Sequence, residues 1–338
     1  MVRRLFASSL ALGCTALLVT FAGAFDKPKT ESSKAAADKP AAKAEAADKK
    51  AGAKKPDEPL FLRVVRNDRD VPVAMDTAVV RYTATEGKYA GRTVDLIGAV
   101  HIGDKDYYKK LNKLFTEYDS LLYELLAKKG TKIPKGGRGG SGHPVGMMQQ
   151  GMTDVLGLAY QLEEVDYTPK NFVHADMSPK EFDDKMKERG ESWMGMMFKM
   201  MGHGIALQAE NGGGGGGTEL EMLFAFFDSN RELKLKRALA KQFESMDDMM
   251  GGIDGEDGST IITERNIAAF KVLAEELDAG KKKIGVFYGA GHLADMDQRL
   301  IKEFGLKRES TTWLTAWSME DTAKKPGKPR AKPAKKAG

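Results

Sequence analysis

The chain has 338 residues, of which 30% are charged, and its formal net charge at pH 7 is +5. This length allows one large domain or two small ones, with ample apolar material for a core. The excess positive charge lies mostly in the two terminal regions, so it does not indicate a nucleic-acid-binding surface, and we expect no nucleic acid partner.

The first 24 residues have the pattern of a secretory signal peptide, because a basic start precedes an uncharged run over residues 5–24 that ends in small residues. We therefore expect cleavage after Ala24 and export to the periplasm or the cell exterior. The alternative is an uncleaved membrane anchor, since the run is near the length that spans a bilayer. The only cysteine, Cys14, lies inside this run, so the mature chain would contain no disulfide and no thiolate ligand.

Two further segments are too polar to form a core. Residues 25–59 consist mainly of Lys, Ala, Asp, Glu and Pro, and residues 319–338 end the chain as a basic, Pro-containing tail. We expect a disordered linker and a disordered tail, because such compositions cannot bury enough apolar surface to fold. The tail is either a solvated end or a contact to an anionic envelope surface, such as a membrane or wall polymer.

The globular domain is expected over residues 60–318 and begins with strand patterns. Runs at 61–66 and 77–85 are alternating or β-rich, and a turn at 86–91 leads into the apolar run that starts at residue 93. A helix is predicted at 107–118, with Asp104 as its N-cap and four apolar residues on one face.

The next apolar run, Ser120-Leu-Leu-Tyr-Glu-Leu-Leu126, reads as a short buried strand that carries Glu124. Burying an unpaired carboxylate is costly, so a buried Glu124 predicts a cationic or metal partner. The alternative is an exposed position on a helix. We favour the buried strand position with a cationic or metal partner, because Glu124 follows the preceding helix at the distance expected of an adjacent strand.

Composition changes between residues 136 and 258, where Gly-rich segments alternate with helical patterns. We expect a helical insertion over about 136–258, with helices at 151–164, 179–190, 191–208 and 219–250. Its methionines are clustered, which indicates loosely packed helix cores or a lid, an adaptable peptide-binding surface, or a copper(I) thioether site. The six-Gly run at 212–217 is expected to be a linker.

The last part of the domain returns to alternating elements. A helix is predicted at 260–278, with Glu264, Arg265 and Asn266 in its first turns. An apolar strand then leads to His292, and a helix at 295–304 and a closing strand at 310–317 follow.

Two of the apolar runs end in Gly-x-x-His, at Gly98–His101 and at Gly289–His292. Each reads as strand, tight turn, histidine and helix. Ligands bind outside the carboxyl ends of strands in open α/β sheets, so imidazoles there suit a metal. A third copy at 140–143 lies in a Gly-rich loop without a preceding strand, and we treat it as a chance match.

As a set, the two Gly-x-x-His units, Glu124 and the helix that carries Arg265 resemble the TraB/PrgY/GumN family, within the TIKI and erythromycin-esterase-like superfamily. The resemblance covers roughly residues 60–317 and implies an α/β fold in which a central mixed sheet is flanked by helices. The helical, Met-rich insertion would then lie between two β-GxxH-α units. In the TIKI branch the implied activity is proteolysis of secreted peptides with a divalent transition metal. Other members are linked to peptide-pheromone shutdown, and a related fold binds haem.

Residue by residue, the resemblance assigns His101 and His292 to the paired-histidine motif, Glu124 to the acidic position after the first motif, and Arg265 to the arginine of the late helix. His174 and Asp176 lie in a variable segment and are second-rank candidates.

Two histidines and one glutamate form a ligand set used by catalytic zinc, and the absence of sulfur also admits manganese, cobalt or iron. Such a metal would activate a water for attack on an amide. Arg265 would hold the oxyanion or a substrate carboxylate, and Glu264 or Asp176 would serve as general base.

We therefore expect an exported metal-dependent hydrolase, in the first place a peptidase, acting on a peptide or small-molecule substrate. One alternative is a non-catalytic extracytoplasmic binder of a peptide, haem or metal ion. The other is a structural envelope protein in which both histidines cap strand ends through hydrogen bonds.

Overall fold

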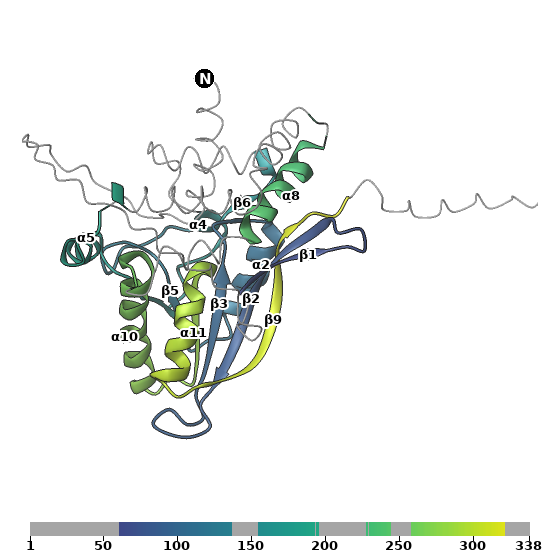
Figure 1. The fold of residues 1–338 in the computed structure, drawn as a ribbon. Helices are drawn as coiled ribbons and strands as arrows, with labels where there is room; N and C mark the ends of the chain where they lie inside the picture. The colour runs from purple at the N-terminus through teal and green to yellow at the C-terminus, as the bar shows by residue number, and fades with distance from the viewer. Residues whose placement is uncertain are drawn as a thin grey trace, which may run out of the picture.

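The computed structural model describes residues 61–136, 155–192, 194–195, 228, 230–244 and 258–321 (Figure 1). The expected signal peptide, the linker, all but the first residues of the basic tail, the six-Gly run and most of the methionine clusters lie outside the described residues. Among the described helices, none is both long enough and apolar enough to cross a membrane.

A mixed sheet forms the centre of the described part of the chain. Seven strands take part, in the order β1-β2-β3-β8-β5-β7, and β9 pairs with β2. β3, β8, β5 and β7 run parallel, whereas β2 pairs antiparallel with β1, β3 and β9. The strands are β1 Leu62–Arg66, β2 Pro72–Thr83, β3 Thr93–Ala99, β5 Ser120–Tyr123, β7 Phe172–His174, β8 Lys283–Gly289 and β9 Lys307–Ser318. The predicted α/β class is thus confirmed.

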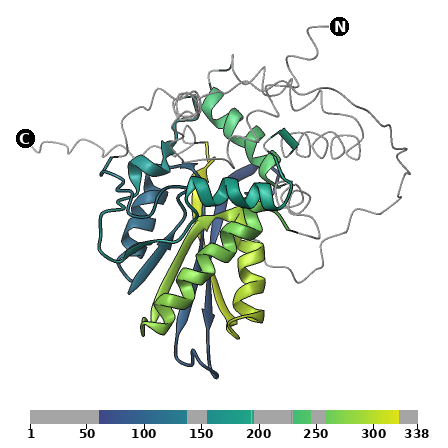
Figure 2. The same cartoon turned by 90° about the vertical axis from the view of Figure 1, so that its left-hand side faces the viewer.

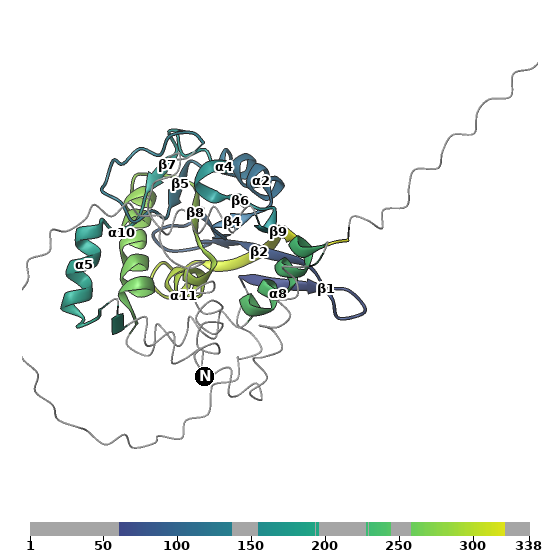
Figure 3. The same cartoon turned by 90° about the horizontal axis from the view of Figure 1, so that it is seen from above.

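Helices cover both faces of the sheet. On β3, Ile97 packs in one core cluster with α2, whereas its neighbour Leu96 packs in a second cluster with α10 and α11. Figure 3 shows α2 and α11 on opposite sides of the strands. Both faces being covered explains why β3 and β8 read as continuous apolar runs. The helices are α2 Lys105–Phe115, α4 Gln161–Glu164, α5 Pro179–Glu188, α8 Arg231–Glu244, α10 Arg265–Asp278 and α11 Leu293–Lys302.

The segment expected as a helical insertion contributes to the sheet. β7 pairs in parallel with β5, so residues 172–174 belong to the central sheet. The predicted helix at 151–164 is wrong at residues 159–160, which form β6 (Ala159–Tyr160) opposite β4 (Ile102–Gly103). Here pairing with a distant strand overrides the local pattern. α5 and α8 are helical as predicted, and α5 lies across the N-terminal end of α10 (Figure 2).

Asp104 precedes α2 as expected, but its carboxylate does not cap the helix. Instead Oδ2 accepts a hydrogen bond of 2.6 Å from the backbone N–H of Ser318, and Oδ1 lies 3.3 Å from Nζ of Lys236. Asp104 therefore links the start of α2 to the end of β9 and to α8.

Candidate functional site

Three neighbouring parallel strands end at the same edge of the sheet and carry the candidate residues. β8 pairs in parallel with both β3 and β5. Glu124 follows β5 directly, and His101 and His292 follow β3 and β8. Ligands bind at this edge of an open α/β sheet, so the fold brings the two Gly-x-x-His units and the acidic residue to a ligand-binding position.

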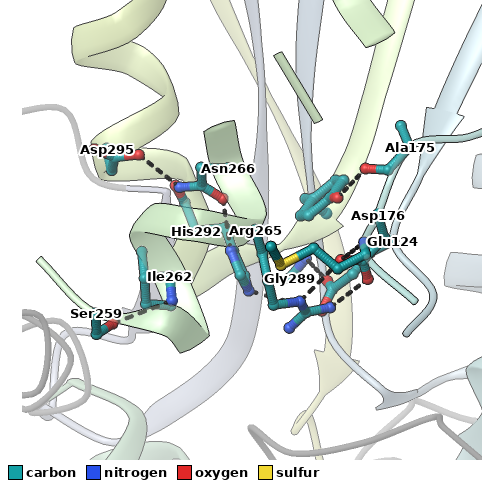
Figure 4. Close-up of polar contacts among 12 residues, drawn as sticks. Glu124, Ala175, Asp176, Ser259, Ile262, Arg265, Asn266, Gly289, His292 and Asp295 are labelled. Atoms are coloured by element: carbon teal, nitrogen blue, oxygen red, sulfur yellow. Dashed lines mark hydrogen bonds and ion pairs between the residues drawn. The ribbon is translucent and has the colours of Figure 1, made fainter. Parts of the chain in front are cut away.

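Glu124 is held by two hydrogen bonds (Figure 4). Its Oε1 accepts from Nη2 of Arg265 at 2.7 Å, and its Oε2 accepts from the backbone N–H of Gly289 at 2.7 Å. Burial alone would raise the pKa of Glu124, but Arg265, the two histidines and the backbone N–H of Gly289 together outweigh burial and hold the pKa well below its usual range. Glu124 is therefore ionised at neutral pH. Its pairing with a cation agrees with the prediction made for a buried carboxylate at this position.

Arg265 lies between two carboxylates. Its Nε and Nη2 donate to Oδ1 and Oδ2 of Asp176 at 3.0 Å and 2.6 Å, in addition to the bond to Glu124. The side chain of Asp176 is fully buried and that of Arg265 is 9% exposed. Burial alone would lower the pKa of Arg265, but the two carboxylates raise it well above its usual value. The three side chains form a fixed unit with a net charge of −1.

A π-helical turn, η1 (Thr260–Glu264), precedes Arg265. Ser259 is its N-cap, and the Oγ of Ser259 accepts a hydrogen bond from Ile262 N at 3.2 Å. Single π-helical turns are rare and are often found at functional sites. Both residues that follow it, Arg265 and Asn266, are buried. Arg265 reaches Glu124 beyond β5, and Asn266 reaches His292 beyond β8 (Figure 4). The predicted helix at 260–278 is thus α10 preceded by this irregular turn.

Asn266 fixes the tautomer of His292. Its Nδ2 donates to the carbonyl oxygen of His292 at 3.1 Å and to Oδ2 of Asp295 at 2.8 Å, so Oδ1 is the acceptor end of the amide. This Oδ1 lies 2.7 Å from Nδ1 of His292, which must therefore carry the proton. Nε2 is left with its lone pair.

The unprotonated Nε2 of His292 lies 3.7 Å from Oε1 of Glu124. Burial lowers the pKa of His292 to about 4, although the charge of Glu124 opposes this shift. The imidazole is therefore neutral at pH 7, and two atoms that carry lone pairs face one another.

A small pocket adjoins this group of residues. It is lined by His101, Glu124, Leu125, Leu126, Gln161, Leu162 and Arg265. The backbone ties two of these walls together, because the carbonyl oxygen of His101 accepts a hydrogen bond of 2.8 Å from Gln161 N. The pocket thus brings the first histidine to the same place as Glu124 and Arg265.

Two of the candidate residues have other partners. The carboxylate of Glu264 lies 3.3 Å from Nη1 of Arg189 and 3.9 Å from Nζ of Lys185, and Glu264 does not line the pocket. Nε2 of His174 donates a hydrogen bond of 2.6 Å to the carbonyl oxygen of Leu125, since a carbonyl can only accept. Asp176 joins the site, but through Arg265 rather than on the pocket wall.

Three residues of the site received no role from the sequence. Gly289 contributes its backbone N–H, Asn266 orients His292, and Gln161 lines the pocket. For Asn266 the available signal was its place beside Arg265. Gln161 begins the Gln-Leu-x-x-x-Asp pattern of the family resemblance, over residues 161–166, but that pattern assigned it no role.

Among the described residues, no three His, Cys, Asp or Glu side chains gather as a group that could hold a metal. His292 and Glu124 approach each other closely, and His101 reaches the same pocket as Glu124. The structure therefore places two of the predicted ligands together and the third on an adjoining wall.

Comparison of the chain with protein-family models, with curated proteins and with solved structures finds no match. The resemblance to the TraB/PrgY/GumN family therefore stays a prediction.

Proposed function

We propose that this chain is an exported metal-dependent hydrolase of the TraB/PrgY/GumN type, and specifically a peptidase. His101, Glu124 and His292 would hold one divalent transition metal at the carboxyl ends of β3, β5 and β8. The observation that carries the proposal is the approach of the unprotonated Nε2 of His292 to the ionised Oε1 of Glu124, at 3.7 Å.

The protonation states of these residues fit a metal. Ligation needs a neutral imidazole and an ionised carboxylate, which are the forms that His292 and Glu124 take at neutral pH. At metal–ligand distances of about 2.0 to 2.2 Å, two ligand atoms of one ion lie at most about 4 Å apart. The 3.7 Å between Nε2 and Oε1 falls within this limit.

The hydrogen bond that Nδ1 of His292 donates to Oδ1 of Asn266 also fits a metal site. Proteins commonly orient a ligating histidine by a hydrogen bond to its other ring nitrogen. Asn266 is itself fully buried and bonded to Asp295, so it holds the ring of His292 in one orientation through Nδ1.

When bound, a divalent metal lowers the pKa of a water and polarises a carbonyl oxygen. The protein's own contribution is charge and position. Arg265 lines the pocket, where its fixed positive charge can stabilise a developing oxyanion, and Asp176 holds the guanidinium in its orientation. Of the two carboxylates proposed as general base, neither lines the pocket. Within the described residues Glu124 is the carboxylate that does.

A non-catalytic binder of a peptide, haem or metal ion is the second candidate. It is favoured by the pairing of Arg265 with Glu124 and Asp176, because an ion pair already satisfies much of the charge in the site. A binder needs no general base, which agrees with the positions of Glu264 and Asp176.

Metal analysis of the purified full-length chain tests the proposal. We expect about one divalent metal ion per chain in the wild type, loss of it in His292→Ala and His101→Ala, and retention in the control His174→Ala, whose Nε2 is bonded to backbone. Cleavage of a peptide library should follow the metal content. A wild-type chain that takes up no divalent metal contradicts the proposal, whereas metal uptake without cleavage favours the binder.

A further inference from the structure

The π-helical turn η1 sets the direction of the first residues of α10. The backbone N–H of Glu264 donates to the carbonyl oxygen of Ser259 at 3.1 Å, whereas in an α-helix it would donate to Thr260. The turn thus holds one residue more than an α-helical turn, and this residue rotates the preceding chain by about 100° relative to α10. π-helical turns are rare, so we expect contacts from elsewhere in the fold to hold this one.

Arg189, the C-cap of α5, joins the two ends of η1. Its Nη2 donates to the carbonyl oxygen of Gly258 at 2.6 Å, just before the turn, and its Nη1 donates to Oε1 of Glu264 at 3.3 Å, at the last residue of the turn. The carboxylate of Glu191 accepts from the backbone N–H of Thr260 at 3.1 Å and from Nε of Arg189 at 2.9 Å. Arg189 and Glu191 therefore form a clamp on the turn.

α5 provides a fixed base for this clamp. The backbone N–H groups of Arg189 and Glu191 both donate to carbonyl oxygens in the second half of α5. Before the other end of α5, Asp176 pairs with Arg265. α5 is thus attached to the start of α10 from both of its ends, and it lies across that start in Figure 2.

The clamp and the site are coupled through η1. If the turn relaxed to an α-helical one, either the chain before it or α10 after it would have to rotate. Rotation of the preceding chain breaks its bonds to Arg189 and Glu191. Rotation of α10 instead takes Asn266 away from His292. The side chains of Arg189, Glu191 and Glu264 are 24%, 19% and 15% exposed, so solvent screens their charges only in part.

We propose that Arg189 is a positioning residue, which together with Glu191 keeps η1 in its π-helical register. The clamp thereby fixes Asn266 against the ring of His292. Glu264, which the sequence suggested as a general base, is then the end of the turn that Arg189 holds. The inference deepens the proposed function, and it rests on that function only where it calls the place of His292 a metal site.

The tautomer of His292 reports the position of Asn266 without any metal. In the chelator-treated full-length protein, the chemical shifts of the two ring nitrogens, measured by heteronuclear NMR, show which of them carries the proton. We expect the Nδ1–H form alone in the wild type, because Oδ1 of Asn266 accepts from Nδ1. In Arg189→Met a second population with the proton on Nε2 should appear. Its affinity for Zn²⁺ should fall about tenfold, the lower end of the effect of residues that orient a ligand.

Two further variants separate positioning from stability. Lys180→Met is the matched control, because it removes an exposed ion pair with Asp184 from the same helix and should leave the tautomer unchanged. Glu264→Leu removes one contact of the clamp and should shift the tautomer in the same direction as Arg189→Met, but less. It decides where Arg189→Met does not fold. A folded Arg189→Met that keeps the wild-type tautomer overturns the inference, even if urea unfolds it more easily.

Zn²⁺ binding is measured separately, so that the two proposals can fail independently. If Arg189→Met keeps the tautomer while the wild type binds Zn²⁺ and His292→Ala does not, only the role of Arg189 is refuted. If Arg189→Met releases the ring but the wild type binds no Zn²⁺ or other divalent metal, only the proposed metal chemistry is refuted.

Discussion

Replacing Arg265 with methionine should destabilise the protein strongly, because the change leaves two buried carboxylates without their cation. Arg265 makes three charge-assisted hydrogen bonds to Asp176 and Glu124, whose side chains are 0% and 14% exposed. Removing one partner of a buried ion pair costs about 3–5 kcal/mol. That loss is a large part of the roughly 5–15 kcal/mol by which a domain is stable.

The loss should depend on pH. In the wild type the pKa of Glu124 is held below its ordinary value. The ionised Glu124 therefore stabilises the folded protein above its unfolded pKa of about 4.3, and this stabilisation is lost as the pH falls toward the folded pKa. In Arg265→Met, burial without the cation raises the pKa of Glu124, so the variant regains stability as Glu124 becomes protonated. The difference between the two proteins is therefore largest at neutral pH and narrows on acidification.

Urea denaturation followed by circular dichroism at several pH values between 7 and 4 measures this difference. Lys88→Met is the control, because its pair with Asp278 is exposed and should affect stability little. An Arg265→Met variant within about 1 kcal/mol of the wild type at pH 7, or a difference that grows on acidification, refutes the view that Arg265 compensates two buried charges.

Three further predictions follow from the site and the core. In chelator-treated protein the imidazole of His292 should titrate near pH 4 by NMR. The stability of the fold should therefore decrease as the pH drops from about 6.5, the ordinary pKa of histidine, toward 4. A midpoint above about pH 6 contradicts the burial of His292 as a neutral ring. Asn266→Leu should weaken metal binding about 10- to 100-fold by releasing Nδ1 of His292, and unchanged affinity in a metal titration would show that Asn266 does not orient the ring. Gly285→Ala on β8 should cost about 1–3 kcal/mol in urea denaturation, because its Cβ would lie 2.6 Å from Cδ1 of Leu121; full stability would mean that the packing there is looser than described.

The strand ends that carry the site were predictable from local pattern. The sequence predicts that His101, His292 and Glu124 lie at one edge of a sheet. Each of them follows or ends an apolar run. The parallel pairing of β8 with both β3 and β5 confirms that arrangement of strands. Local hydrophobic period is informative here because both faces of these strands are buried.

The partners of the charged residues were not predictable in the same way. Asp176 was expected as a general base, but it pairs with Arg265, which lies 89 positions away in the chain. Asn266 bonds to His292 two residues after a π-helical turn, for which local sequence gives no established signal. Gln161 joins the pocket because β6 pairs with β4, an interaction set by tertiary contacts rather than by local propensity.

X-ray absorption spectroscopy of the metal-loaded protein tests most directly whether His101 and His292 share one ion. We predict scattering from two imidazoles and a carboxylate oxygen in the wild type, and from one imidazole in His101→Ala under conditions that still permit loading. A wild-type spectrum without imidazole ligands, or one that His101→Ala leaves unchanged, would contradict the shared site.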